Sequence, residues 1–297
     1  MSLLTGLSAF PLTPLAQGWV DEGAFIGLIE RLAGADVDSV TVLGSTGSYV
    51  YLSTKERARV TELAVRHAGG IPVFVGVGAL RTSDVLDNVK AAEEAGAAGI
   101  LLAPVTYQPL TDQEVFRLYR TVTESTGLPV IVYDNPGTTR FSFTDDLYAQ
   151  VAELPGIVSV KIPAVPAGDA AERIAAVRSL LPEHVTIGVS GDATAVEGLI
   201  GGADAWYSVV GGLLPELALG IIRAVQEGRT GDALREAELL APLWELFAEY
   251  GSLRVIAAVA ELAGAVGPQC LPLPVCGLES PVRTRVAEVV RGLGMGR

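Results

Sequence analysis

The feature that most constrains the fold is an alternation, repeated eight times, of a short apolar segment and a longer amphipathic one. The short segments are almost wholly apolar and are soon followed by Gly or Pro. They cover residues 7–10, 39–43, 72–77, 99–103, 129–133, 157–161, 185–190 and 205–209. Short strands that are apolar throughout are typical of a parallel sheet buried on both faces. The alternation therefore predicts strand–helix units joined into a parallel sheet.

The longer segments have the spacing of helices. In residues 21–33, Phe25, Leu28 and Leu32 fall on one face. Residues 53–56, Ser-Thr-Lys-Glu, form a capping box before the next helix. Eight units predict a closed (β/α)₈ TIM barrel. A doubly wound open sheet is the alternative, and the lack of a G-x-G-x-x-G motif after the first strand weakens it.

The alternation ends near residue 228. Beyond it, residues 233–250, 253–262 and 281–293 have helical patterns, separated by Gly and Pro. We therefore expect a barrel domain over residues 1–228 and a small extension of three helices over residues 229–297. The extension is expected to pack on the barrel and to take part in subunit contacts.

Charge and composition exclude several classes of function. The net charge of −13 argues against nucleic acid and anionic membranes as partners. The sequence has no apolar run of about 18 residues and no signal-peptide pattern at its N-terminus, so we expect a cytoplasmic protein. His67, His184, Cys270 and Cys276 lack the spacing of metal ligands or of a redox pair, and no metal is expected.

Lys161 ends the sixth apolar strand, whereas the other two lysines of the chain lie in polar helical patterns. At strand period, Val158, Val160 and Ile162 face one way and Lys161 faces the other. Desolvation there disfavours the ammonium and makes the neutral amine available. A neutral amine can attack a carbonyl group and form a Schiff base. The structural alternative is a paired lysine at a strand edge.

Other polar groups also follow predicted strands, where the active sites of such barrels lie. Residues 44–48, Gly-Ser-Thr-Gly-Ser, follow the second strand, and their backbone N–H groups could bind an anion. Tyr133 ends the fifth strand, and its phenol can donate and accept protons, although a core role is more usual. With Lys161, these groups could bind a carboxylate, condense with the adjacent keto carbon and move the protons. This predicts a site for a 2-keto acid that uses no metal or organic cofactor.

Five motifs resemble, in order and spacing, the dihydrodipicolinate synthase / N-acetylneuraminate lyase family of class I aldolases. They are Gly44-Ser45-Thr46-Gly47, Tyr133-Asp134-Asn135-Pro136, Val160-Lys161, Ser190-Gly191-Asp192 and Gly202-Ala203-Asp204. The resemblance spans nearly the whole chain. It implies a homo-oligomer, usually a tetramer, that binds pyruvate or another 2-keto acid and an aldehyde or sugar-acid co-substrate.

The resemblance also implies roles for individual residues. Lys161 would form the Schiff base, and Tyr133 would shuttle protons. The segment Ser45-Thr46-Gly47 would bind the carboxylate and relay protons. The family's tyrosine from a neighbouring subunit falls near Thr106 and Tyr107. The unshifted register gives Thr106, and a one-residue shift of the loop gives Tyr107, which is the candidate catalytic residue.

Several positions depart from the family's pattern. The usual Thr-Thr-Gly-Glu reads Ser-Thr-Gly-Ser at residues 45–48. In synthases that make dihydrodipicolinate, an Arg follows the Tyr by five positions; here that position is Thr138, and Arg140 lies two residues further on. Tyr207 replaces a smaller apolar residue and is expected to narrow or polarise the pocket. Arg254 could reach the site, although a surface or interface salt bridge is the preferred interpretation.

These departures leave the exact reaction open. We expect a Schiff-base lyase or aldolase acting on a 2-keto acid, with 4-hydroxy-tetrahydrodipicolinate synthesis as one activity. A 2-keto-3-deoxy sugar-acid aldolase or dehydratase is an alternative, because the loss of a charge-assisted contact at Thr138 costs roughly 1.5–3 kcal/mol. A non-catalytic 2-keto-acid-binding protein is the alternative of another class.

Overall fold

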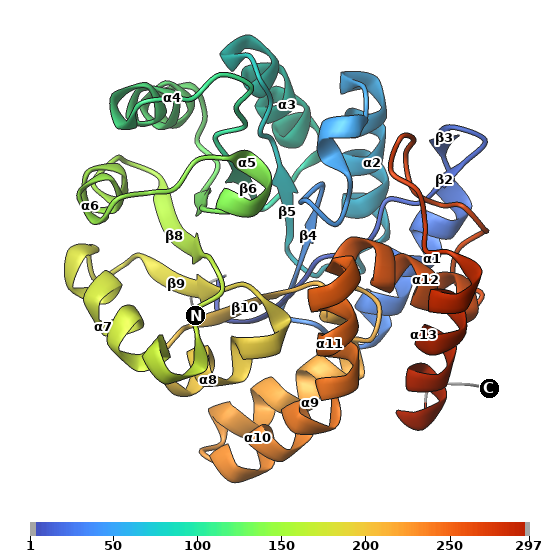
Figure 1. The fold of residues 1–297 in the computed structure, drawn as a ribbon. Helices are drawn as coiled ribbons and strands as arrows, with labels where there is room; N and C mark the ends of the chain where they lie inside the picture. The colour runs from blue at the N-terminus through green and yellow to red at the C-terminus, as the bar shows by residue number, and fades with distance from the viewer. Residues whose placement is uncertain (1–3, 295–297) are drawn as a thin grey trace.

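The computed structural model describes residues 4–294 and contains an eight-stranded barrel surrounded by helices (Figure 1). The neighbouring strands run β1-β10-β9-β8-β7-β6-β5-β4, all parallel, and β1 pairs with both β10 and β4. This closure confirms the (β/α)₈ barrel and excludes the open sheet. The barrel strands are β1 (Gly6–Ala9), β4 (Ser39–Val42), β5 (Val73–Gly76), β6 (Gly99–Leu102), β7 (Val130–Tyr133), β8 (Ile157–Ile162), β9 (Thr186–Val189) and β10 (Ala205–Ser208).

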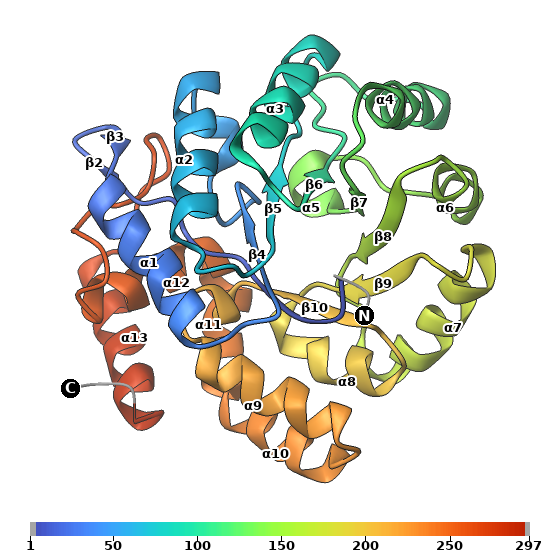
Figure 2. The ribbon, with the colours of Figure 1, turned by 180° about the vertical axis from the view of Figure 1, so that it is seen from behind.

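Helices connect the strands and cover the outside of the barrel, as Figures 1 and 2 show from opposite sides. They are α1 (Glu22–Gly34), α2 (Thr54–His67), α3 (Thr82–Ala95), α4 (Asp112–Ser125), α5 (Pro136–Thr139), α6 (Asp145–Ala152), α7 (Ala170–Leu180), α8 (Ala195–Ile200) and α9 (Pro215–Gln226). The predicted capping box is present, because Ser53 and Glu56 each accept a hydrogen bond from the other's backbone N–H.

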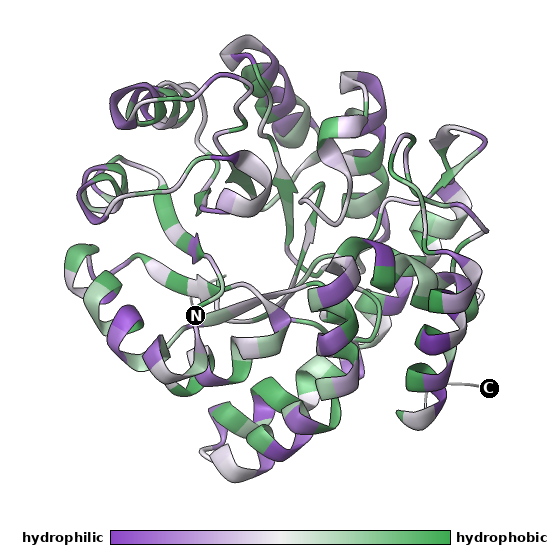
Figure 3. Cartoon of the chain, viewed as in Figure 1, coloured by the Kyte–Doolittle hydropathy of each residue, from purple (hydrophilic) through white to green (hydrophobic). Residues whose placement is uncertain are grey.

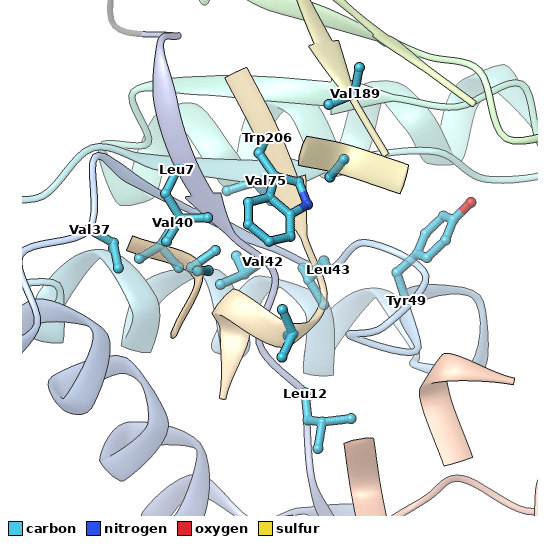
Figure 4. Packing of buried hydrophobic residues seen from close by; sticks show 14 of the residues in the cluster. Leu7, Leu12, Val37, Val40, Val42, Leu43, Tyr49, Val75, Val189 and Trp206 are labelled. Carbon is cyan, nitrogen blue, oxygen red and sulfur yellow. The ribbon is translucent and has the colours of Figure 1, made fainter. Parts of the chain in front are cut away.

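Two layers of side chains hold the barrel together. Figure 3 shows apolar residues along the strands and on the sides of the helices that face them. The outer layer fills the space between strands and helices, and Figure 4 shows Trp206 there with Leu7 and Val42. The inner layer lies inside the barrel and includes Phe74 and Tyr207. Trp206 and Tyr207 are consecutive on β10, and successive side chains of a strand point to opposite faces of the sheet.

The C-terminal extension contains four helices instead of the three expected. They are α10 (Thr230–Leu239), α11 (Ala241–Tyr250), α12 (Ser252–Leu262) and α13 (Ser280–Gly292). The prediction of one helix over residues 233–250 is wrong, because the helix is interrupted at Leu240. Pro242 has no N–H to donate to the preceding turn, so it begins a new helix there. α10 packs on α8 and α9, and the division of the chain at residue 228 stays a prediction.

Three further details differ from the sequence-based expectations. Val158 is half-buried against the inner cluster, so the prediction that it shares a face with Val160 is wrong. The register between β7 and β8 shifts at this point, because Val130 pairs with Ile157 and Ile131 pairs with Ser159. Val158 is therefore an extra residue in β8, and it interrupts the alternation of inward- and outward-facing side chains. Neither the one-turn helix α5 nor the hairpin of β2 (Leu15–Ala16) and β3 (Trp19–Val20) was predicted from the sequence.

A search of residues 4–294 for a helix long and apolar enough to cross a membrane found none.

Candidate active site

Lys161 lies inside the barrel near the carboxyl end of β8. It pairs in register with Tyr133 on β7, and its side chain is buried, at 4% exposure. Its Nζ lies 3.8 Å from the ring centroid of Phe10 and 4.3 Å from that of Tyr133. Burial lowers the pKa of Lys161 to about 7, and the carboxylate of Asp192 acts in the opposite direction. A substantial fraction of the amine is therefore neutral at physiological pH.

The phenol of Tyr133 is held by two neighbours. Its oxygen lies 3.2 Å from Ser45 Oγ and accepts a hydrogen bond of 2.6 Å from Asn135 Nδ2. Burial raises the pKa of Tyr133, while the hydrogen bonds with Ser45 and Asn135 lower it. Because Asn135 occupies one acceptor site, the phenol proton is free to point towards Ser45 or into the barrel. This is the geometry of a proton relay that reaches from Tyr133 to the loop after β4.

The loop after β4 is tightly packed, and its glycines are required. A Cβ at Gly44 would lie 2.7 Å from the ring of Phe10, and one at Gly47 would lie 2.9 Å from Leu43 N. Leu43 and Ser48 have φ angles of 56° and 54°. Such left-handed conformations at non-glycine residues cost energy and cluster at functional sites.

Thr46 is almost wholly buried in this loop, and Ser45 is half-buried with its hydroxyl at Tyr133. The structure thus brings together the loop, the phenol and the amine that the sequence indicated separately.

Asp192 organises the end of β10. Its carboxylate accepts hydrogen bonds from Trp206 Nε1, Ser208 Oγ and the backbone N–H groups of Val209 and Val210, at 2.7–3.3 Å. Burial raises its pKa, and these donors oppose that change. Sequence reasoning placed Asp192 in a motif but gave it no role. Phe10, whose ring faces the amine, carried no sequence signal beyond its place after the first strand.

The other predicted site residues lie in different surroundings. Tyr207 is buried, and its hydroxyl lies 2.9 Å from Ser159 Oγ. A Cβ at Gly188 would meet its ring at 2.0 Å, so Gly188 makes room for it. Tyr207 belongs to the cluster inside the barrel, and its ring centroid is 5.5 Å from Lys161 Nζ; a narrower pocket stays a prediction.

Four predicted residues are exposed. Tyr107 is 85% exposed in the loop between β6 and α4. Thr138 and Arg140 are exposed at α5. Arg254 is exposed on α12, and its Nε donates to the backbone carbonyl of Cys276 at 3.1 Å; a salt bridge at a subunit interface stays a prediction. Within one chain, these four side chains are not part of the cluster around Lys161.

Among residues 4–294, no group of three or more His, Cys, Asp or Glu side chains has the arrangement of a metal site.

Comparison with known proteins gives a consistent result. A sequence model described as the dihydrodipicolinate synthetase family matches residues 3–292. The 4-hydroxy-tetrahydrodipicolinate synthase of Gluconacetobacter diazotrophicus is 31% identical over 291 residues, which covers 96% of this chain and 95% of the relative. The enzyme of the same name from Methylococcus capsulatus is 30% identical over 290 residues, covering 97% of each.

Solved structures agree over the same span. The crystal structure of a dihydrodipicolinate synthase from Agrobacterium tumefaciens superimposes with a TM-score of 0.95, at 44% identity and 98% coverage of both chains. A dihydrodipicolinate synthase from Acinetobacter baumannii, crystallised with pyruvate, gives a TM-score of 0.89 at 25% identity, covering 99% of this chain and 100% of the other. The chain therefore belongs to the dihydrodipicolinate synthetase family, and it is an enzyme of the lyase and aldolase type.

Proposed function

We propose that the protein binds pyruvate, or another 2-keto acid, as a Schiff base on Lys161. The observation that carries this proposal is a buried amine, with a pKa lowered to about 7, beside the phenol of Tyr133. The pyruvate in the related Acinetobacter baumannii structure supports the choice of substrate. The buried loop of Ser45, Thr46 and Gly47 would bind the carboxylate, which the net charge of −13 requires to be held locally.

The chemistry follows from these groups. The neutral amine of Lys161 attacks the keto carbon, and the carbinolamine loses water to give an iminium ion. Removal of a proton from the methyl carbon gives an enamine, which attacks an aldehyde and forms the new carbon–carbon bond. Hydrolysis of the second iminium releases the product and the amine. Tyr133 and Ser45 would donate and accept the protons in these steps.

The second substrate is set by what surrounds the methyl carbon. The family's guanidinium position is Thr138, an exposed residue, and Arg140 is exposed as well. This favours an aldehyde that lacks the carboxylate of aspartate semialdehyde, such as the aldehyde released from a 2-keto-3-deoxy sugar acid. Assays of pyruvate with aspartate semialdehyde, beside aldol cleavage and dehydration of 2-keto-3-deoxy sugar acids, distinguish the candidates. A rate with aspartate semialdehyde well above the others would assign the synthase activity.

The Schiff base is tested by borohydride reduction in the presence of pyruvate, followed by peptide mass mapping. We expect one modified peptide, carrying Lys161 and a mass increase of pyruvate minus water plus two hydrogens. Lys161→Arg should give no adduct, and Lys90→Arg should still give it, because Lys90 is an exposed lysine paired with Glu94. No adduct on Lys161 with pyruvate or longer 2-keto acids would refute the proposal. Adduct without turnover of any aldehyde would favour a binding protein.

We also propose a homo-oligomer, a tetramer or a dimer, in which Tyr107 enters a neighbouring site. The support is a set of exposed apolar side chains in three successive loops after β4, β5 and β6, where strand ends carry the site. They are Val50, Tyr51, Leu80 and Tyr107. A cytoplasmic location stays a prediction of the sequence.

A further inference from the structure

We propose that the ring of Phe10 stabilises the positively charged states of the Lys161 nitrogen, both the ammonium and the iminium of the Schiff base. The iminium part rests on the function proposed above, whereas the ammonium part does not. Phe10 would then be a catalytic residue, because its ring face touches the reacting nitrogen.

The geometry at Lys161 carries this inference. Among residues 4–294, three aromatic rings lie over Nζ, and Phe10 is the nearest, at 3.8 Å from its centroid. A cation within about 6 Å of a ring face is attracted by the ring quadrupole, and the attraction strengthens where water is excluded. Phe10 is 1% exposed and Lys161 is 4% exposed, so little solvent weakens this contact.

Phe10 is also fixed in place by its surroundings. Its N–H donates to the carbonyl of Ser208 at 2.9 Å, and its ring meets Tyr207 edge-on at 5.9 Å. Gly44 and Gly212 leave room for it. A Cβ on Gly44 would lie 2.7 Å from the ring of Phe10, and a Cβ on Gly212 would lie 2.1 Å from the carbonyl oxygen of Phe10. A ring held this firmly needs no rearrangement when positive charge develops on the nitrogen.

The ring of Phe10 and the burial of Lys161 have opposite effects on its charge: burial disfavours the charged amine, and the ring favours it. The titratable groups that face Lys161 are the phenols of Tyr133 and Tyr207 and the carboxylate of Asp192. Weakening the quadrupole of Phe10 should therefore lower the pKa of Lys161 and reduce the amount of iminium. If the ring served only to exclude water, a ring of equal size with a weaker quadrupole would leave both unchanged.

The test replaces Phe10 with 4-fluoro-, 3,5-difluoro- and 3,4,5-trifluorophenylalanine, which keep the ring's size and progressively cancel its quadrupole. Because the chain has only three lysines, protein labelled with ¹³C at the lysine Cε gives three NMR signals, which Lys55→Arg and Lys90→Arg assign. We expect the pKa of Lys161 to fall stepwise, by about half a unit to one unit for the trifluoro ring. At a pH well above the pKa of Lys161, where the free amine is neutral, the equilibrium constant for forming the pyruvate iminium should fall about three- to tenfold.

The matched control is the same series at Phe74, a fully buried ring of the same inner cluster on β5. It should leave the pKa of Lys161 unchanged. An unchanged or higher pKa with fluorinated rings at position 10, or an equal fall in the Phe74 series, would overturn the proposal. Absence of adduct in the unmodified protein would refute the Schiff base, while the lysine titration would still decide whether Phe10 stabilises the ammonium.

Discussion

Lys161 occupies a position that stabilises its neutral form and destabilises its charged form. Its pKa falls from 10.5 to about 7 because it is buried. Between these two values, the unfolded chain binds a proton that the folded chain does not, so the free energy of unfolding rises with pH across this window. Below pH 7 the folded state carries the full cost of the buried charge. The residue that we propose forms the Schiff base thus weakens the fold.

Lys161→Met should therefore make the protein more stable at pH 7 while abolishing adduct formation. The gain has an upper limit of about 5 kcal/mol, the free-energy equivalent of the pKa shift, and it should shrink as the pH approaches 10. Denaturant unfolding at both pH values measures it. Lys90→Met, at an exposed position, should change stability by less than about 0.5 kcal/mol. A Lys161→Met protein that is less stable than the parent at pH 7 would contradict the cost assigned to the buried amine.

Tyr133 and Ser45 should act as one proton relay, because their oxygens are 3.2 Å apart. Tyr133→Phe should slow enamine formation by roughly 10²–10⁴-fold, and Ser45→Ala by less. The double variant should be little slower than Tyr133→Phe alone, since groups that act as a unit are not additive. Exchange of the pyruvate methyl protons in D₂O, followed by NMR, measures this step without any second substrate. Effects that multiply in the double variant would mean that the two hydroxyls act independently.

At the scale of elements, the strands and most helices could be predicted from the sequence because each has a local signal. The barrel strands are short and apolar on both faces, and Ser53 and Thr111 cap the helices that they begin. The break at Leu240 was missed because helical spacing continues across it on both sides. The shift at Val158 was missed because it depends on how β8 pairs with β7.

The residues of the candidate site also differ in whether the sequence alone indicates them. The sequence indicates Lys161, Tyr133 and Ser45 as candidates because they stand at or just after the carboxyl ends of predicted strands, where the active sites of such barrels lie. Phe10 and Asn135 could not be predicted, because a phenylalanine after a strand and an asparagine in a turn are common in any barrel. Their contacts appear only in the folded structure, with 3.8 Å between the Lys161 amine and the ring centroid of Phe10 and 2.6 Å between Asn135 Nδ2 and the Tyr133 phenol oxygen.

The fit of β9 against β10 depends on one glycine. A Cβ on Gly188 would lie 2.0 Å from a ring atom of Tyr207, so Gly188→Ala should cost about 1–3 kcal/mol or more. Combined with Tyr207→Val, which removes the ring, the alanine should cost at least about 1 kcal/mol less than it does alone. Denaturant unfolding of the two single variants and the double variant measures the coupling. Gly127→Ala is the control, because a Cβ there meets nothing within 4 Å in the described structure. Strict additivity would show that the strands shift to admit the methyl group.

At the scale of the whole molecule, closure of the barrel assembles the site from residues far apart in the sequence. Ser45 follows β4, Tyr133 ends β7, Lys161 is the last residue but one of β8, and Phe10 follows β1. In a closed parallel barrel these strand ends meet at one face, so each side chain reaches the same interior. Tyr107 follows β6 at the same face, yet it is 85% exposed and is not part of the cluster around Lys161 in its own chain. A second copy is the partner that would give this side chain a role.

Subunit complementation tests that role. Lys161→Ala retains Tyr107 but has no amine, and Tyr107→Phe retains the amine but lacks the phenol, so each variant should be slow alone. If Tyr107 is donated to a neighbour, a mixed assembly contains sites with Lys161 from one chain and Tyr107 from the other, and mixing should recover activity that neither variant has. Recovery should require subunit exchange, and chemical crosslinking of each variant before mixing should prevent it. Activity of the mixture equal to the sum of the separate variants, with exchange demonstrated by native mass spectrometry, would show that Tyr107 is not donated to a neighbouring site.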